Sequence, residues 1–421
     1  RIQGWGEGLR SIINSQPPRT DFDWSKGIAK FPPGATISHE IGQWCVYPNF
    51  DEIAKYTGVL QPMNFHIFRD FLNANHMGDQ ASEFVMASGK LQTLCYKEEI
   101  ESALRTPGMG GFQLLDLHDF PGQGTALVGV LDPFWDSKPY VSPAEFRRFC
   151  NDIVPLARLP KRIVSSGATL KAAIELYQFG PRDLTNSVVQ WELQNSQGKA
   201  VDSGALSDIE LPRGRLLPLG NITVKIPEVS VAQKLRLVVG IRDTDYENDW
   251  DLWVYPREVP VDPPQDLLIT DQLNDRALSV LDQGGKVMLT PHPDSIAGDI
   301  ALGFTTVFWN TAWTKNQAPH TLGILCDPDH AALNDFPTEY HTNWQWWELI
   351  HRASPMVLDE LPSDVRPLVQ VIDTWFEARR LGLVFEGKVG SGKLLVCSMD
   401  ITHDLATRPV ARQMRHSLIN Y

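Results

Sequence analysis

The sequence predicts a multidomain protein in which an immunoglobulin-like β-sandwich separates two α/β segments. Residues 1–158 and 263–421 alternate β-type runs with helical stretches, an order that is typical of α/β domains. Residues 159–262 instead contain short β-type runs separated by turn signals, a pattern that is typical of a sandwich. A chain of 421 residues is long enough to bury several cores of this size.

Composition excludes several classes of protein. The formal net charge of -13 argues against nucleic acid and anionic membrane surfaces as partners, because both repel an acidic protein. The five Cys are scattered without a CxxC pair, which excludes a disulfide scaffold and a Cys-rich zinc site. No apolar run reaches the length of a membrane span, so we expect no membrane insertion. The 13 Trp favour carbohydrate or another stacking ligand, although Trp also fills large cores.

The first segment is organised around a β-type run from Ala35 to Trp44. Pro and Gly precede the run and Gly42 interrupts it, so we expect a buried strand with Glu40 at its C-terminal end. A parallel barrel places its chemistry at that end of its strands. A carboxylate followed by Gly and by the rings of Trp44 and Tyr47 suits a sugar site, in which apolar rings contact the pyranose. The alternative is a structural Glu40 that hydrogen-bonds a loop.

The rest of the first segment alternates helices and strands. Apolar residues at helical spacing, a Pro-Gly stop and a Ser-Pro start set the expected bounds. The expected elements are the end of a short helix, or a turn, at 12–15, helices at 65–75 and 81–105 (the second long and amphipathic), a strand at 110–120 and a helix that begins at Ser142. This order indicates parallel strands joined by right-handed crossovers.

The middle segment is predicted to be all β. Strands are expected at 170–179, 187–195, 220–226, 234–241 and 250–256. Turn signals at Asn195–Gly198 and Pro212–Gly214 separate some of these runs. The aromatic residues of the last strand are interpreted as the packed edge of the sandwich rather than as a sugar platform.

The last segment is predicted to be a small open-sheet α/β domain. Its expected elements are strands at 267–270, 285–290, 321–326 and 394–398 and a helix at 273–283. Gly387–Lys393 lacks the phosphate-loop pattern and precedes a strand, so we expect a hairpin turn and no nucleotide site. Cys326 and Cys397 have apolar neighbours and no nucleophile elbow, which indicates inert buried thiols. The histidines of this segment show no metal-ligand spacing.

Two motifs of the first segment carry a resemblance to a known family. Ser38–Gly42, followed by Gly110–Phe112 and Leu115–Asp119, resembles the last two strands of the catalytic barrel of glycoside hydrolase family 2. That family contains β-galactosidases, β-glucuronidases and β-mannosidases. The resemblance implies that residues 1–158 form the second half of a (β/α)8 TIM barrel. Residues 263–421 resemble the glutamine-amidotransferase-like domain of some bacterial members, without a catalytic Cys.

The resemblance also implies a role for each candidate residue. Glu40 would be the nucleophile of a retaining exo-β-glycosidase of the β-galactosidase type, which hydrolyses terminal sugars of oligo- or polysaccharides by double displacement. His39 would contact the sugar or orient Glu40, and a structural role under the strand is equally open. No cofactor and no metal ion is required. The expected substrate-binding residues are His39, Trp44, Tyr47, Asp116, His118 and Asp119.

The chain departs from the family pattern in two places. The family's acid/base Glu follows an Asn, and residues 1–40 contain no Asn-Glu dipeptide. We therefore expect that group upstream of Arg1, in a longer periplasmic or secreted bacterial polypeptide whose signal also lies upstream. Leu115 and Leu117 stand where many members carry Trp. The competing hypothesis is a non-catalytic carbohydrate-binding or scaffold protein that keeps the fold, and the oligomeric state, including a homo-oligomer, is left open.

Overall fold

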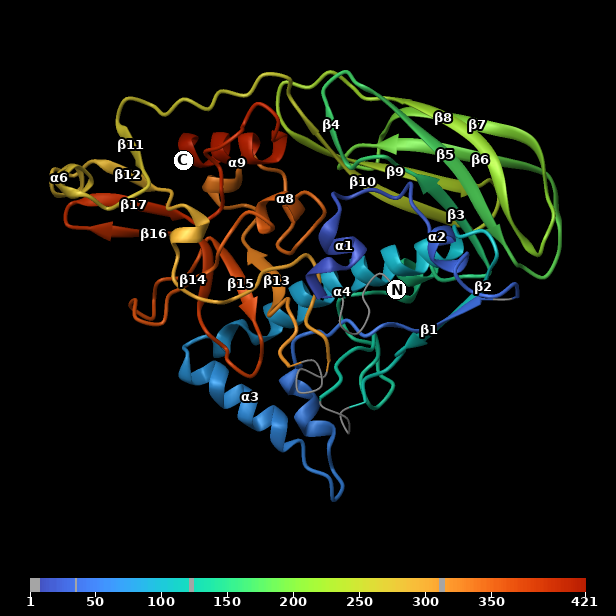
Figure 1. Ribbon diagram of the computed structural model, residues 1–421, viewed down its shortest axis with the longest axis horizontal. Coiled ribbons are helices and arrows are strands. Elements are labelled where there is room, and N and C mark those ends of the chain that lie inside the picture. The colour runs from blue at the N-terminus through green and yellow to red at the C-terminus, as the bar shows by residue number, and fades with distance from the viewer. Residues whose placement is uncertain (1–7, 35, 121–124, 310–314) are drawn as a thin grey trace.

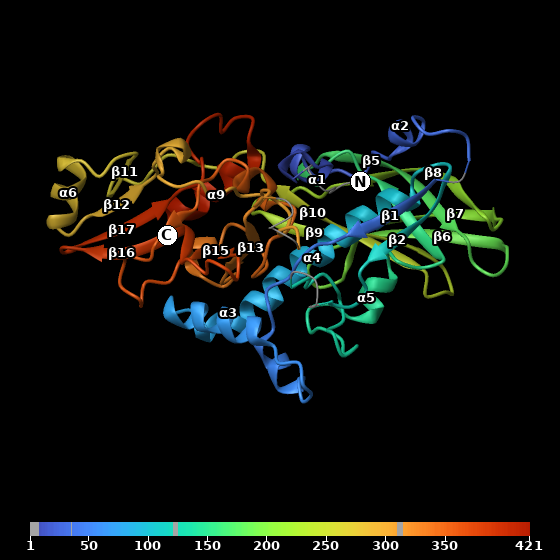
Figure 2. The ribbon, with the colours of Figure 1, turned by 60° about the horizontal axis from the view of Figure 1, so that its bottom comes forward.

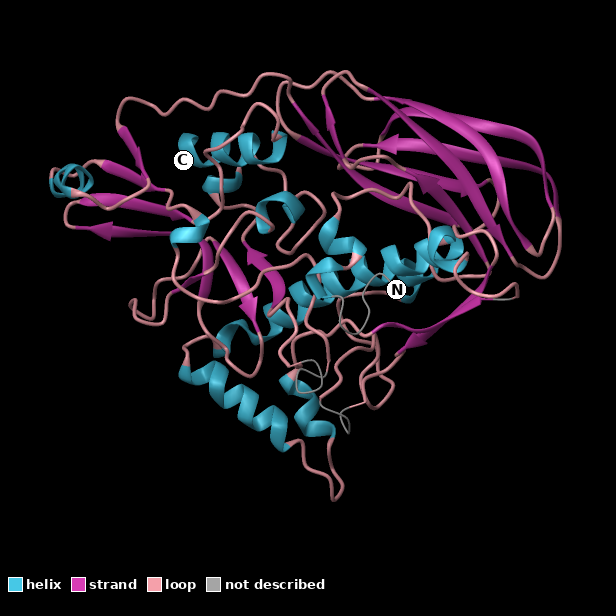
Figure 3. Ribbon diagram, viewed as in Figure 1, coloured by secondary structure: helices cyan, strands magenta, loops and turns pink. Residues whose placement is uncertain are grey.

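The computed structural model describes residues 8–34, 36–120, 125–309 and 315–421. Sheets dominate its regular structure and helices are few. The β-sandwich lies at one end of the molecule and the C-terminal sheet at the other, with helix α4 (Ala81–Leu104) crossing the space between them (Figure 1). Figure 3 shows the same division, with the strands gathered at the two ends and most helices between them.

A two-stranded parallel sheet forms the centre of the first segment. Strand β1 (Thr36–Gly42) pairs with β2 (Met109–Leu115), and the chain between them includes α4, as the strand, helix, strand order predicts. The register aligns Gly42 with Leu115, so both strands end at the same edge of the sheet. Many α/β folds contain such a unit, so the half barrel stays a prediction.

The other helices of this segment are α1 (Ile12–Ser15), α2 (Ser25–Ile28), α3 (Met63–Ala74), α5 (Pro143–Arg147) and 3-10 turns at Gly8–Arg10, Phe50–Lys55 and Gly78–Gln80.

The middle segment is a β-sandwich, as predicted. One sheet has the order β4-β10-β9-β6-β7 and the other the order β3-β5-β8, and a hydrophobic core lies between them. Because β3 pairs with β5, the sandwich begins near residue 153 rather than at 159. The strands are β3 (Ile153–Arg158), β4 (Ile163–Ser165), β5 (Thr169–Gln178), β6 (Leu184–Gln194), β7 (Ala200–Leu211), β8 (Arg215–Lys225), β9 (Gln233–Ile241) and β10 (Glu247–Tyr255).

The last segment contains an open mixed sheet of order β11-β12-β17-β16-β15-β13, with β14 beside β16. Strands β11, β12 and β17 run parallel, and the remaining pairs are antiparallel. Strands β16 and β17 form a hairpin around Gly390, which confirms the predicted hairpin turn. An amidotransferase-like domain is not distinguished by this topology and stays a prediction.

The elements of this segment have the following bounds. The strands are β11 (Leu267–Thr270), β12 (Lys286–Leu289), β13 (Thr321–Cys326), β14 (Met356–Val357), β15 (Val369–Asp373), β16 (Leu381–Val389) and β17 (Gly392–Cys397). The helices are α6 (Asp275–Asp282), α8 (Trp346–Ile350), α9 (Pro409–Asn420) and 3-10 turns at Pro293–Ser295 and Ala331–Leu333. The helix predicted at 273–283 corresponds to α6.

Helix α4 is buried around most of its circumference, whereas the sequence predicts an amphipathic helix. One core cluster contains Leu91 and Ile100 of α4, Trp253 of the sandwich and Val371 of the C-terminal sheet. The other two segments therefore cover faces of α4 that the first segment alone would leave in water. Because all three segments share this core, their junctions resemble a protein interior rather than a mobile interface. Figure 2 shows α4 beside β1 and β2 at the junction of the segments.

Buried charges on α4 link it to the sandwich. Glu101 accepts hydrogen bonds from Asn248 Nδ2 at 2.8 Å and Trp250 Nε1 at 3.0 Å, and its carboxylate lies 2.7 Å from Lys97 Nζ. Burial alone would raise the pKa of Glu101, but the positive charges of Lys97 and Arg105 outweigh burial and the pKa is lowered. Glu101 is therefore a buried anion whose partners come from two segments.

We expect Glu101→Ala to lower the free energy of unfolding by about 3–5 kcal/mol, because it leaves Lys97 and two sandwich donors without their buried acceptor. Urea unfolding at pH 7 measures the change. Glu83→Ala is the matched control, because Glu83 is exposed on the same helix. This substitution should lower the free energy of unfolding by less than about 1 kcal/mol. Equal, small effects of both variants would show that the Glu101 network does not hold the segments together.

Candidate functional site

Glu40 lies at a bulge near the C-terminal end of β1. Its φ is 54°, an uncommon value for a residue other than Gly, and the register shifts between Ser38 and Ile41. The side chain is 39% exposed. His39 Nε2 lies 3.2 Å from Glu40 Oε1, and Gln43 Nε2 donates to Glu40 Oε2 at 3.3 Å. The bulge thus gives a partly exposed carboxylate with a polar neighbour on each oxygen.

The end of β2 adds further polar groups to the same sheet edge. Gln113 Oε1 lies 2.9 Å from His39 Nδ1, which links the two strands through their side chains. Asp116 follows β2 directly, and its carboxylate lies 4.0 Å from His118 Nε2. Both Asp116 and His118 are partly exposed, with side-chain values of 30% and 28%. We call His39, Glu40, Gln113, Asp116 and His118 the strand-end cluster.

An exposed indole lies beside this cluster. The rings of His118 and Trp135 have centroids 4.6 Å apart, and Trp135 is 61% exposed. Phe134 and Leu117 nearby in the sequence are also exposed, at 40% and 41%. An accessible aromatic ring next to carboxylate and imidazole groups is an arrangement that can hold a sugar ring by its apolar face.

A groove of about 790 Å³ lies along the first half of β1 and reaches the strand-end cluster at His39. It includes His39 and lies between β1 and α2, with the exposed side chains of Phe31 and Ile37 along it. A volume of this size is within the range of small-molecule sites. His39 is the one member of the strand-end cluster that lines this groove.

Helix α4 fixes the chain just after Glu40. Glu99 Oε2 accepts hydrogen bonds from the Gly42 backbone N–H at 3.0 Å and from Trp44 Nε1 at 3.1 Å. The Gln43 N–H also donates to the Leu115 carbonyl at 2.9 Å, which joins the ends of the two strands. A buried carboxylate thus anchors the residues that follow the strand-end cluster.

Three predicted substrate-binding residues are buried and do not reach an open surface. Trp44 is 0% exposed, belongs to the hydrophobic core that the three segments share, and forms a backbone β-bridge with Phe308 of the C-terminal segment. Tyr47 is 1% exposed and packs edge-on against Phe84 with ring centroids 5.3 Å apart. Both rings therefore pack in the protein interior and do not face an open surface where a sugar could stack.

Asp119 is the third of these residues. It is 1% exposed, lies 2.7 Å from Lys138 Nζ and accepts a hydrogen bond from the Gly129 N–H at 2.8 Å. Burial raises the pKa of Asp119 to about 6, against the opposing effect of Lys138. It holds the loop after β2 in place and does not lie at the rim of a pocket.

Sequence reasoning missed Gln43, Gln113 and Trp135. Trp135 lies in Asp132-Pro-Phe-Trp-Asp136, where two aromatic residues stand between carboxylates in a turn, and this pattern could have indicated exposed rings. Gln113 could have been found only through the register of β1 against β2, which the sequence does not specify.

Within residues 8–34, 36–120, 125–309 and 315–421, no group of three or more His, Cys, Asp or Glu side chains could hold a metal ion. Burial raises the pKa of the Cys326 and Cys397 thiols to about 12, which agrees with the prediction of inert thiols. Among the helices that the structure describes, none has the length and apolar character of a membrane span.

Glu52 is a buried titratable residue on the 3-10 turn Phe50–Lys55, whose Lys55 pairs with Asp132 and Asp136 on either side of Trp135. Glu52 is 2% exposed, and its Oε2 has no hydrogen-bond partner among the described residues. Burial raises the pKa of Glu52 to about 7; the positive charge of Lys138 opposes the shift, and the carboxylates of Asp119 and Asp132 add to it. Glu52 therefore carries a proton in part of the chains at neutral pH.

One family model, a domain of unknown function (DUF8487), matches residues 268–421, and another, DUF8488, matches residues 168–256. A comparison with curated protein sequences finds no match.

Several solved structures show weak similarity over part of the chain. A Parabacteroides merdae β-glucuronidase is 16% identical, with a TM-score of 0.19 over 33% of this chain and 21% of that chain. A β-glucuronidase from glycoside hydrolase family 2 is 12% identical, with a TM-score of 0.20 over 33% of this chain and 18% of that chain. The CARDB domain of a Pyrococcus furiosus protein is 10% identical, with a TM-score of 0.20 over 25% of this chain and 94% of that chain. The present chain thus spans about a fifth of the length of these two β-glucuronidases.

The raised pKa of Glu52 predicts a pH dependence of stability. The folded chain keeps the Glu52 proton up to about pH 7, whereas the ordinary value for Glu is 4.5. The folded state binds more protons than the unfolded state between these pH values, so this residue makes the free energy of unfolding fall as the pH rises from about 4.5 to 7. Glu52→Gln should therefore unfold with a free energy about 2–3 kcal/mol higher than the unmodified protein at pH 8, with little difference at pH 4.

Urea unfolding at several pH values measures this effect. Glu360→Gln is the matched control, because Glu360 is exposed and its loss should leave the pH profile unchanged. A Glu52→Gln variant with the same pH profile as the unmodified protein would contradict a protonated, buried Glu52.

Proposed function

We propose that the protein is a retaining β-glycosidase that removes terminal sugars from oligo- or polysaccharides, with Glu40 as its nucleophile. The observation that supports this most is the placement of Glu40: a half-exposed carboxylate at the end of a parallel strand, with His39 and Gln43 beside its two oxygens. Such a group is accessible to the anomeric carbon of a sugar while its orientation is restricted. A periplasmic or secreted location would accompany a polysaccharide substrate.

The reaction would proceed by double displacement. A Glu40 oxygen attacks the anomeric carbon, the glycosidic C–O bond breaks, and the leaving oxygen takes a proton from a second carboxylic acid. The resulting ester is then hydrolysed by water, which gives its proton back to that second group. The two carboxyl groups of retaining enzymes are about 5–5.5 Å apart. We assign the acid/base role to no residue among those that the structure describes.

The neighbouring strand end would bind the sugar. Trp135 offers an exposed ring face for the apolar side of a pyranose, and Asp116 and His118 offer hydrogen-bonding groups for its hydroxyls. The groove along β1 would take the remainder of a longer glycan.

A second candidate function is carbohydrate binding without catalysis. The exposed rings of Trp135 and Phe134 favour it, since a stacking platform needs no second carboxyl group. The two functions differ in whether Glu40 forms a covalent bond with the sugar, and this difference can be measured.

The proposal predicts that an activated 2-deoxy-2-fluoro glycoside forms a stable ester with Glu40. The full-length protein would be incubated with a panel of such glycosides of different sugars and its peptides analysed by mass spectrometry. We expect one sugar to add its mass to the peptide that contains Glu40, and Glu40→Gln to remove the label. Asp51→Asn, which changes an exposed carboxylate near in sequence, should leave it unchanged.

A label on a different carboxylate would show that Glu40 is not the nucleophile. Absence of any label, together with measurable binding of a glycan, would favour the binding function instead.

Both functions predict that the Trp135 ring contributes to the affinity of the protein for its sugar. Trp135→Ala should weaken binding of the recognised sugar about 10-fold, because stacking of this size is worth about 1–1.5 kcal/mol. Isothermal titration calorimetry measures the change. Phe179→Ala, which removes an exposed ring of the sandwich, is the control and should bind normally. Equal affinities of the two variants would exclude Trp135 from the sugar site.

A further inference from the structure

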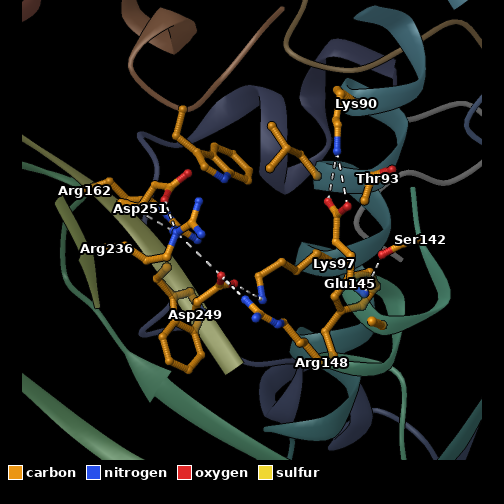
Figure 4. Close-up of a pocket in the computed structure, with 15 residues that line it drawn as sticks. Lys90, Thr93, Lys97, Ser142, Glu145, Arg148, Arg162, Arg236, Asp249 and Asp251 are labelled. Carbon is orange, nitrogen blue, oxygen red and sulfur yellow. Dashed lines mark hydrogen bonds and ion pairs between the residues drawn. The ribbon is translucent and has the colours of Figure 1, made fainter. Parts of the chain in front are cut away.

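A second cavity lies where the three segments of the chain meet, away from Glu40. It has a volume of about 430 Å³ and lies between α4, α5, strands β9 and β10 of the sandwich and Trp344 of the last segment. Figure 4 shows Lys90, Glu145 and Ser142 on one side of this junction cleft and Arg162, Arg236 and Asp251 on the other. The volume is enough for a small molecule.

The junction cleft has a surplus of positive charge. Five of its lining side chains are Lys or Arg and three are Asp or Glu. Much of this charge has close partners: Arg148 donates to Asp249 and to Glu247 at 2.6 Å each, and Lys90 lies 3.2 Å from Glu145. These pairs join α4 and the chain around α5 to each other and to the sandwich. Their charges are therefore accounted for by structural ion pairs.

Arg162 differs from these residues. It is 3% exposed, and its Nε has no hydrogen-bond partner among the described residues. The terminal nitrogens of Arg162 make only long contacts, 3.5 Å to the Asp251 carbonyl and 3.7 Å to Glu98 Oε2. The guanidinium also lies 5.2 Å from the centre of the Trp344 ring. A buried guanidinium normally makes several short, charge-assisted hydrogen bonds, whereas Arg162 makes only long contacts and leaves its Nε without a partner among the described residues.

Arg236 gives the same side of the cleft a second, more accessible guanidinium. Its side chain is 44% exposed, and its Nε lies 3.1 Å from Asp251 and 3.6 Å from Asp249. Burial lowers the pKa of Arg162 and the neighbouring carboxylates Glu98, Glu101 and Asp251 oppose the shift, which indicates that the charge of Arg162 is incompletely compensated.

We propose that the junction cleft binds a small molecule that carries one oxyanion group, a carboxylate, sulfate or phosphate, on an apolar or ring-shaped body. The oxyanion accepts hydrogen bonds from Arg162 and Arg236, whose planar guanidinium groups match its geometry. The rest of the ligand packs against the side chain of Leu94, which is partly exposed and lines the same cleft. This site is independent of the function proposed for Glu40.

Titration calorimetry of the full chain at low ionic strength tests the site. The probes are inorganic phosphate, sulfate and glucuronate, with glucose as the neutral match for glucuronate. We expect at least one oxyanion to bind and glucose not to bind. Preference for glucuronate would identify a sugar acid as the ligand class, and preference for phosphate or sulfate would identify a phosphorylated or sulfated one.

Variants separate the cleft from non-specific charge effects. Arg236→Gln changes a partly exposed side chain and should weaken oxyanion binding about 10-fold, as should Arg162→Lys, which keeps the charge but removes the guanidinium fork. Arg257→Gln is the control, because Arg257 is exposed and pairs with Glu228 outside the cleft. Absence of binding by all three oxyanions would overturn the proposal, as would equal affinities of Arg236→Gln and Arg257→Gln. The comparison with Arg236→Gln stands even if Arg162→Lys fails to fold.

Discussion

The buried carboxylates of α4 are the constraint on which the rest of this structure depends. Glu99 accepts hydrogen bonds from the end of β1, Glu101 accepts them from β10 of the sandwich, and Glu98 pairs with Arg105 and Arg162. Removing a partner from such a group costs several kcal/mol, because the remaining charge stays buried. The helix therefore fixes the first segment relative to the sandwich through directional contacts, in addition to the shared hydrophobic core.

The same helix separates the two candidate sites. Lys90, Thr93, Leu94 and Lys97 follow helical spacing and line the junction cleft on one face of α4. Glu99 comes two residues after Lys97, on a different face, and contacts the end of β1. The strand-end cluster and the junction cleft thus lie against different faces of one rigid element.

Much of the secondary structure could be predicted from local patterns. The long helix α4 and the β16–β17 hairpin follow from apolar periodicity, a Pro-Gly stop and turn residues. Strand β7 (Ala200–Leu211) was not predicted, because most of its residues are polar, small or exposed and lack a clear apolar alternation. Local patterns also do not show that β3 belongs to the sandwich, because this depends on its pairing with β5.

The candidate site was predicted less well, for a physical reason. Partial exposure of Glu40, Asp116 and His118 is compatible with their expected placement at a strand edge. Trp44 is buried in a core that includes residues of the C-terminal segment, and no local sequence pattern shows contacts with residues so distant in the chain.

The most direct test of this account is amide hydrogen exchange of the peptide that contains Gly42 and Trp44, in the unmodified protein and in Glu99→Ala. If Glu99 anchors the end of β1, the variant should exchange the Gly42 amide at least about 10-fold faster, because that N–H loses its buried acceptor. Peptides of α3 serve as an internal reference and should exchange as before. Unchanged exchange at Gly42 would show that α4 does not position the strand end that presents Glu40.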